Sequence, residues 1–174
     1  MNTDHITVQM ASPVGCIYIS SDGNSIISVS FRTPEIDALH TDLNEKAVPS
    51  CIELCANQLS EYFSGSRRTF DLPLSPAGTE FQQRVWKQLE QIPYGRTISY
   101  LDLAKQLGDP KVIRAAGTAN GKNPIAIIIP CHRVIGSNGD LVGYGGGLPN
   151  KKWLLEHEQQ HYHGISQASL FPQS

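Results

Sequence analysis

The sequence predicts an α+β protein in which a small antiparallel sheet precedes a helical domain built around a helix–turn–helix. Apolar and polar residues alternate over residues 6–31, which is typical of short antiparallel strands. Residues 79–120 then hold three amphipathic helical stretches, and the last two are joined at a single glycine, as in a helix–turn–helix. The 174 residues suffice for one domain or two small ones, and 40% hydrophobic with 17% charged residues excludes a wholly disordered chain.

The N-terminal half is expected to contain three strands, a polar loop and one helix. Turn residues divide the alternating stretch into three strands. The polar residues 32–49 contain two prolines and leave room for one short helix. A helix is predicted from Ser50 to Phe63, because its apolar residues fall on one face and Ser50 with Glu53 forms a capping-box pattern. The proline-containing stretch 67–78 is expected to connect two subdomains.

Two helices of the C-terminal half have sequence signals at their starts. Thr79 with Gln82 and Ser99 with Asp102 each match a capping box, in which side chains at both ends of the first turn bond the backbone. Gly108 ends the second of these helices. We therefore divide the chain into a scaffold subdomain with its linker at 1–78, a helix–turn–helix domain at 79–158, and a flexible tail at 159–174.

The next helix is predicted over residues 110–120. Asp109 followed by proline is a favourable start, since aspartate caps the helix and proline suits the first helical position. This helix is rich in small residues and carries Lys111 and Arg114, so it can approach a nucleic-acid duplex closely. An ordinary helical hairpin has the same pattern, and both interpretations stand at this point.

The rest of the chain is predicted to form a buried strand, a loop and a last helix. Residues 125–129 are all apolar and mostly β-branched, which indicates a buried strand that ends just before Cys131. Residues 136–147 contain six glycines and should form a loop or wing. Asn150 is expected to cap the last helix, with Trp153 among its core contacts.

The net charge of −2 hides a difference between the two halves. Residues 1–79 carry 9 acidic and 4 basic residues, whereas residues 80–174 carry 7 acidic and 10 basic ones. The C-terminal part is therefore basic, and such asymmetry is one indication of a polyanionic partner. The sequence shows neither a secretory signal pattern nor an apolar run long enough to cross a bilayer, so we expect a cytoplasmic protein with no membrane contact.

The four cysteines, Cys16, Cys51, Cys55 and Cys131, form no disulfide framework and are expected to be free thiols. Cys131 directly precedes His132 and Arg133, and cationic or basic neighbours favour the reactive thiolate. A free cysteine is nevertheless most often a small buried hydrophobe. Since no further cysteine or histidine has zinc-site spacing to Cys51 and Cys55, we predict no metal.

Five motifs together resemble one family. They are RAAG at 114–117, NP at 123–124, IPCHRV at 129–134, GYGGG at 143–147 and KWLLEHE at 152–158. In this combination they are similar to the O6-alkylguanine-DNA alkyltransferases, with the likeness running from about residue 79 to 158. The resemblance implies a ribonuclease-H-like N-terminal subdomain followed by a winged helix–turn–helix domain, in a bacterial protein of the single-function type.

Members of that family take an alkyl group from O6 of guanine in DNA onto their own cysteine, once per molecule and without a cofactor. The resemblance implies that Cys131 is the acceptor, that His132 deprotonates it through a water, and that Glu158 orients the histidine. It further implies that Tyr100 protonates the leaving guanine and that Asn123 positions the segment before the cysteine. O4-alkylthymine is a further possible substrate.

The resemblance also implies how DNA is bound. Arg114 would fill the gap left by the flipped nucleotide, with Lys111, Ala115 and Gly117 as further DNA contacts. It places the alkylguanine pocket at Pro130, Tyr144, Gly145 and Gly146. The expected partner is double-stranded DNA containing O6-alkylguanine, bound by a monomer.

The sequence is compatible with three other classes of protein. Alkyltransferase-like proteins bind lesions but lack the acceptor thiol, and Cys131 argues against that class. A helix–turn–helix regulator would use its cysteine for packing only and would bind a specific DNA sequence. A thiol hydrolase built on Cys131 and His132 would turn over many times.

Overall fold

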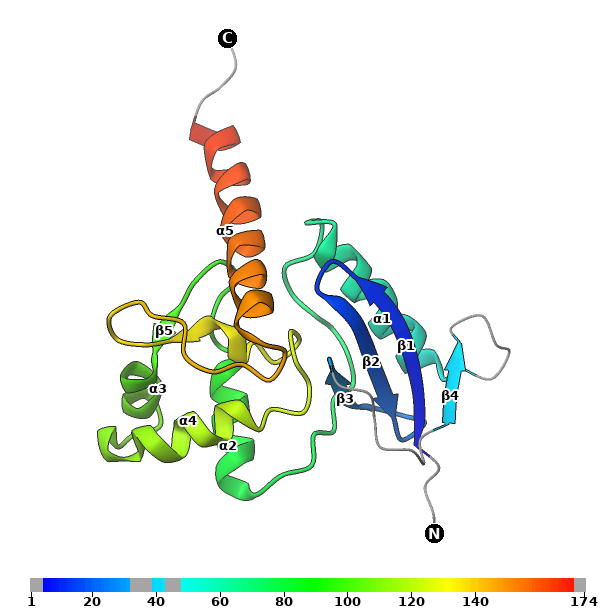
Figure 1. Cartoon of the computed structure of the whole chain (residues 1–174), viewed down its shortest axis with the longest axis horizontal. Helices are drawn as coiled ribbons and strands as arrows, with labels where there is room; N and C mark the ends of the chain where they lie inside the picture. The colour runs from blue at the N-terminus through cyan, green and yellow to red at the C-terminus, as the bar shows by residue number, and fades with distance from the viewer. Residues whose placement is uncertain (1–4, 32–38, 43–47, 171–174) are drawn as a thin grey trace.

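The computed structural model describes residues 5–31, 39–42 and 48–170, with the backbone alone for 39–42 and 163–170. Two lobes lie side by side, an N-terminal sheet with one helix and a C-terminal group of helices (Figure 1). The linker runs along the edge of the sheet, where Ile26 bridges Leu74. This arrangement confirms the predicted α+β class.

The N-terminal sheet has the strand order β3-β2-β1-β4. The strands β1 (Ile6–Ser12), β2 (Gly15–Ser21) and β3 (Ile26–Ser30) pair antiparallel, which confirms the three predicted strands. The strand β4 (Leu39–Asp42) pairs parallel to β1 and makes the sheet mixed, which the sequence did not predict because these four residues do not alternate. The rest of the expected loop or short helix, 32–38 and 43–47, lies outside the described residues.

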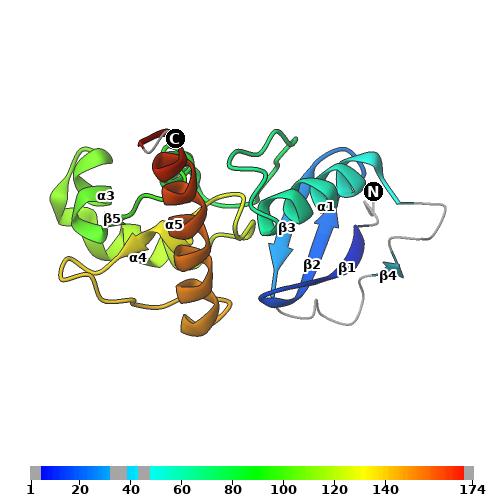
Figure 2. The same ribbon diagram turned by 90° about the horizontal axis from the view of Figure 1, so that it is seen from above.

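The helix α1 (Ser50–Phe63) covers one face of the sheet (Figure 2). Its bounds are as predicted, but its capping box is not formed. Pro49 is the N-cap, no side chain bonds the helix start, and Ser50 already lies inside the helix. By contrast, α2 (Glu80–Leu89) begins with the predicted box, in which the Thr79 hydroxyl accepts from the Gln82 amide and the Gln82 side chain accepts from the Thr79 amide.

These two helix starts give a matched test. We expect Thr79→Ala to lower the free energy of unfolding by about 1 kcal/mol, because the cap of α2 is lost. Ser50→Ala removes no cap bond and should stay within about 0.5 kcal/mol of the wild type. Urea unfolding of both variants measures the difference. Equal losses would show that the box at Thr79 contributes nothing.

The helix–turn–helix is formed as predicted. After β5 (Ile98–Ser99), α3 (Tyr100–Gln106) starts with the Ser99–Asp102 capping box. A 3₁₀ turn, η1 (Pro110–Val112), is capped by Asp109 and leads into α4 (Ile113–Gly121). The first turn of the helix predicted over residues 110–120 is thus wound more tightly than an α-helix, and proline at its first position is compatible with both forms.

Residues 125–129 are buried but do not form the predicted strand. The Ala126 amide donates to the Val29 carbonyl of β3, and the chain then folds back so that the Ile129 amide donates to the Ile125 carbonyl. Ile127 has a φ of 71°, in the left-handed region that β-branched residues rarely adopt. An apolar run between two prolines has the same composition whether it forms a strand or a buried turn. The residue types therefore could not distinguish a strand from a turn.

The chain after this turn carries the motif residues. Cys131 therefore begins a 3₁₀ turn, η2 (Cys131–Arg133), rather than ending a strand, and β6 (Val134–Ile135) pairs with β5. The glycine-rich loop 136–147 follows. The helix α5 (Leu148–Leu170) starts before Asn150, whose side chain does not cap it but donates to the carbonyls of Val14 and Gly146.

The last helix is also longer than predicted. The sequence indicated a flexible tail from residue 159, whereas α5 continues to Leu170. Its extension packs on the body of the protein: the His161 carbonyl accepts from Arg68, and the Tyr162 hydroxyl accepts from Arg96. Within the described residues, no helix is long and apolar enough to cross a membrane.

Candidate active site

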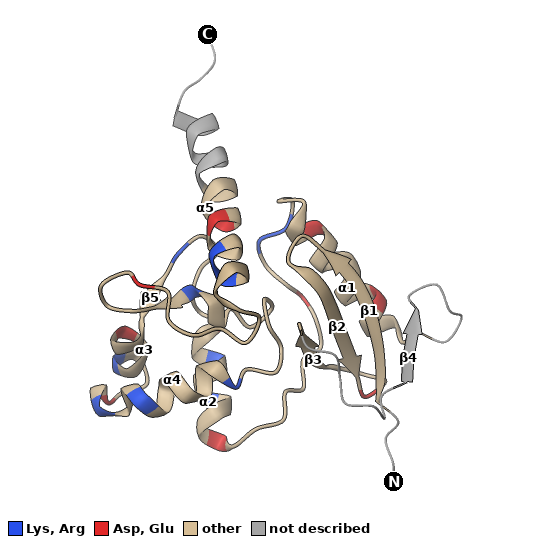
Figure 3. Ribbon diagram, in the orientation of Figure 1, with Lys and Arg blue, Asp and Glu red and all other residues tan. Residues whose placement is uncertain are grey.

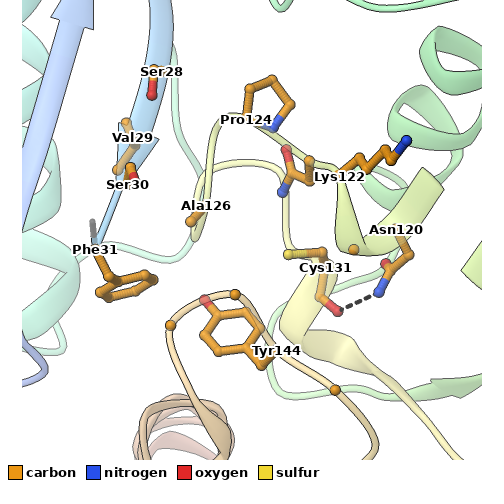
Figure 4. Close-up of a pocket in the computed structure, with 15 residues that line it drawn as sticks. Ser28, Val29, Ser30, Phe31, Asn120, Lys122, Pro124, Ala126, Cys131 and Tyr144 are labelled. Atoms are coloured by element: carbon orange, nitrogen blue, oxygen red, sulfur yellow. Dashed lines mark hydrogen bonds between the residues drawn. The ribbon is translucent and has the colours of Figure 1, made fainter. Parts of the chain in front are cut away.

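Cys131 lies in a pocket of about 250 Å³ between the two lobes (Figure 4). The wall opposite the thiol comes partly from the end of β3 in the N-terminal lobe, which the sequence did not predict. The residues lining the pocket include Ser28, Ser30, Phe31, Asn123, Ala126, Tyr144, Gly145 and Gly146. The thiol is thus enclosed by three segments that are far apart in the sequence.

A buried ion-pair cluster lies behind the cysteine. His132 Nε2 is 2.7 Å from Glu158 Oε1, and Arg133 donates to both carboxylate oxygens at 2.9 and 2.8 Å. The predicted partners His132 and Glu158 are therefore in contact, and both are fully buried. Burial alone would raise the pKa of Glu158, but the charges and hydrogen bonds of His132 and Arg133 outweigh it and hold this pKa well below its ordinary value.

This cluster determines which nitrogen of His132 is basic. An ionised Glu158 accepts only, so His132 Nε2 carries the proton and Nδ1 is left as the acceptor. Burial lowers the pKa of His132, and the attraction of Glu158 offsets this only in part. A neutral, oriented imidazole next to a thiol has the properties of a general base. The water between the two residues stays a prediction.

Lys151 is a residue of the site that sequence reasoning missed. Its side chain is fully buried, and its ammonium donates to the carbonyls of Val134, Val142 and Gly143 at 2.7, 3.1 and 3.3 Å. Burial raises the pKa of the Cys131 thiol, while the Asn123 side chain and the positive charge of Lys151 act in the opposite direction. The sequence did contain one signal for Lys151. Its spacing to Leu154 and Glu158 places these three residues on one face of a helix.

Asn123 and Asn120 hold the backbone on both sides of the buried turn. Asn123 donates to the Ile129 carbonyl at 2.8 Å and accepts from the Ile125 amide at 3.0 Å, so it bonds locally as the resemblance implied. Asn120, which was not predicted, donates to the Cys131 carbonyl at 3.4 Å (Figure 4). The cysteine is therefore fixed through the backbone by the end of α4.

A second, more open groove adjoins the pocket on the side of α4. The predicted DNA contacts lie there or next to it: Arg114 and Gly117 line the groove, and Lys111, Arg114 and Ala115 are exposed. Tyr100, the predicted proton donor to guanine, lines the same groove. The Tyr100 hydroxyl donates to the Val142 carbonyl at 3.0 Å, so the tyrosine ties α3 to the glycine-rich loop. Helix α4 carries Arg114, and Lys111 and Lys122 lie at its two ends, in agreement with the charge split in the sequence (Figure 3).

The residues predicted for the alkyl pocket are only partly brought together. Tyr144, Gly145 and Gly146 line the pocket, and the Tyr144 ring packs edge-on against Phe31 with centroids 5.8 Å apart. Pro130 instead lines a separate cavity behind the cysteine. The turn at η2 explains why Pro130 lies outside the pocket, because neighbouring residues in a turn point in different directions.

The fold and this site define a class of protein, one that carries a buried thiol, with a histidine–glutamate pair behind it, beside a helix–turn–helix. Two family models match the chain: the ribonuclease-like domain of 6-O-methylguanine DNA methyltransferase at residues 8–76 and its DNA binding domain at 80–160. The chain belongs to the 6-O-methylguanine DNA methyltransferase family.

Individual relatives agree with this assignment. The chain is 45% identical to a methylated-DNA–protein-cysteine methyltransferase of Mycobacterium tuberculosis over 148 residues, covering 85% of this chain and 88% of the relative. A protein of the same name from Methanosarcina acetivorans is 45% identical over 150 residues, covering 84% and 94%. The crystal structure of Mycobacterium tuberculosis OGT in complex with DNA superposes with a TM-score of 0.78 at 43% identity, over 89% of this chain and 93% of that one.

Proposed function

We propose that this protein repairs DNA directly, as a methylated-DNA–protein-cysteine methyltransferase that moves the alkyl group from O6 of guanine to Cys131. The observation that carries this proposal is the buried Cys131 in a pocket, with the His132–Glu158 pair behind it and the α4 groove beside it. The thiol proton passes to His132, and the sulfur then attacks the alkyl carbon. A carbon–sulfur bond forms, the carbon–O6 bond breaks, and guanine takes a proton from Tyr100.

The remaining assignments follow from the same site. Arg114 takes the place of the flipped nucleotide, while Lys111, Ala115 and Gly117 contact the DNA backbone. The partner is double-stranded DNA containing an O6-alkylguanine, and the protein acts as a monomer. A free thiol as reagent requires a reducing compartment such as the cytoplasm. Residues 1–78 serve as the scaffold unit and 79–158 as the DNA-binding and catalytic unit.

Intact-mass spectrometry tests the proposed function. After incubation with an excess of an O6-methylguanine oligonucleotide, we expect each protein molecule to gain one methyl group and then to stop reacting. Peptide mapping should place the methyl group on Cys131, with Cys16, Cys51 and Cys55 unmodified. Repeated turnover would indicate the thiol hydrolase, and an unmodified but lesion-bound protein would indicate the alkyltransferase-like class.

The space around two neighbouring glycines allows us to predict how the pocket limits the size of the alkyl group. A Cβ added at Gly146 would lie 2.5 Å from the Phe31 ring, whereas one added at Gly145 meets nothing within 4 Å. Gly146→Ala should therefore push Phe31 into the pocket and slow transfer from O6-benzylguanine about tenfold more than transfer from O6-methylguanine. Gly145→Ala is the control and should leave the ratio of the two rates unchanged. An unchanged ratio in Gly146→Ala would show that Phe31 does not limit the pocket.

A further inference from the structure

One side chain of the N-terminal lobe contacts the buried ion-pair cluster of His132, Arg133 and Glu158. Tyr62, in the last turn of α1, is fully buried, and its hydroxyl donates to Glu158 Oε1 at 2.8 Å. Its backbone carbonyl also accepts from His157 Nε2 at 2.7 Å. Helix α1 therefore holds α5 at two successive residues, and one of them is the carboxylate that orients the histidine.

Tyr62 and His132 share the same carboxylate oxygen. Glu158 Oε1 accepts from the Tyr62 hydroxyl, from His132 Nε2 at 2.7 Å and from Arg133 Nη2 at 2.8 Å. The other oxygen accepts from Arg133 Nε at 2.9 Å and from the Gly95 amide at 3.2 Å. All of these donors interact with the negative charge of one carboxylate. The strength with which Glu158 attracts the proton of His132 therefore depends on the other donors.

The phenol acts as a donor throughout the working pH range. Burial, and after it the charge of Glu158, raise the pKa of Tyr62 well above its ordinary value, so the hydroxyl keeps its proton. Phenylalanine at this position would leave the ring in place and remove one neutral donor from the carboxylate. The charge on Oε1 would then be shared between His132 and Arg133 alone.

We propose that Tyr62 is a positioning residue by which the N-terminal lobe limits how strongly Glu158 attracts the proton of His132, and so keeps that imidazole neutral and able to act as a base. The proposal rests on the proposed function, in which His132 accepts the thiol proton. Tyr62 itself touches neither the thiol nor the pocket that holds it.

The direction of the effect follows from the charges around the pair. Arg133 and Lys151 oppose protonation of His132 and Glu158 favours it, while Tyr94 and His157 also face Glu158. Removing the Tyr62 hydroxyl concentrates negative charge on Glu158, which raises the pKa of His132. A protonated His132 cannot accept a proton from Cys131. The rate of alkyl transfer should therefore fall at low pH and recover at high pH.

The experiment compares Tyr62→Phe with Tyr94→Phe. Both variants lose a buried hydroxyl, and the two rings lie 6.1 Å apart, but the Tyr94 hydroxyl has no hydrogen-bond partner among the described residues. We expect the acid limb of the rate–pH profile for O6-methylguanine DNA to move up by about 0.5 to 1 pH unit in Tyr62→Phe. At pH values below the acid limb the rate would drop about threefold to tenfold, and above the limb it would converge with the wild type. Tyr94→Phe should keep the wild-type profile.

A second variant keeps the proposal testable if Tyr62→Phe folds poorly. Incorporating 3-fluorotyrosine at position 62 preserves the ring and makes the phenol a stronger donor, so the acid limb should move to lower pH. An unmoved limb in both Tyr62 variants, or an equal shift in Tyr94→Phe, would overturn the proposal.

NMR separates a failure of this proposal from a failure of the proposed function. The pKa of His132, followed by NMR titration of ¹³C-labelled histidine without DNA, should rise in Tyr62→Phe and fall with fluorotyrosine. This readout does not depend on alkyl transfer. A wild type that forms no adduct would refute the proposed function, while an unchanged His132 pKa in both variants would refute the role of Tyr62.

Discussion

Replacing Cys131 with serine is expected to abolish alkyl transfer, with a loss of at least about 10³-fold, while binding to O6-methylguanine DNA is retained. A hydroxyl is far harder to deprotonate than a thiol and is a weaker nucleophile toward saturated carbon. The residue is nearly the same size, so the pocket and the α4 groove should keep their shape. Adduct formation is measured by intact mass, and binding by fluorescence anisotropy of a labelled duplex.

Cys16→Ser is the control for this experiment. Cys16 lies in β2 of the N-terminal sheet, is partly exposed and does not line the pocket. This variant should form one adduct per molecule at the wild-type rate. A methyl adduct on Cys131→Ser, or a lost adduct in Cys16→Ser, would assign the acceptor to another cysteine.

Glu158→Gln is expected to lower the free energy of unfolding by about 3 kcal/mol and to slow alkyl transfer. The substitution leaves the buried Arg133 guanidinium without its counter-charge, and breaking one partner of a buried ion pair is costly. It also removes the negative charge that orients His132. Urea unfolding measures the stability, and the rate of adduct formation is measured under conditions in which the variant is folded.

The stability difference should depend on pH. The folded-state pKa of Glu158 lies below its ordinary value of 4.5, so its contribution is fully present above about pH 4.5 and is lost as the pH falls toward the folded-state pKa. The gap between wild type and Glu158→Gln should therefore shrink as the pH is lowered through this range. A gap that stays constant down to pH 3 would contradict the depressed pKa.

Glu156→Gln is the matched control, because Glu156 is exposed on the same helix and its contact with Lys152 is 3.8 Å long. Exposed pairs of this kind contribute little, so this variant should remain within about 0.5 kcal/mol of the wild type. A loss equal to that of Glu158→Gln would mean that the helix tolerates neither change. The buried cluster would then not be the cause.

Local signals in the sequence predicted much of the fold. Alternation predicted β1 to β3, and the capping residues Thr79, Ser99 and Asp109 marked three helical starts that the structure confirms. Each of these signals acts between residues a few positions apart, which is why it can be read without a structure. The predicted cap at Ser50 failed because Pro49 takes the cap position.

The five motifs around Cys131 were also sufficient to identify the family, because their combination and spacing are far more specific than a cysteine beside a histidine alone. Sequence signals therefore determined the three N-terminal strands, three helical starts and the family, and they predicted the reacting residues. The tertiary structure alone decided that 125–129 is a buried turn, that Lys151 lies under the loop, and that Phe31 and Tyr62 reach the site from the other lobe. The physical reason is distance along the chain: contacts such as the hydrogen bond between Tyr62 and Glu158, which are 96 positions apart, leave no periodic or local trace in the sequence.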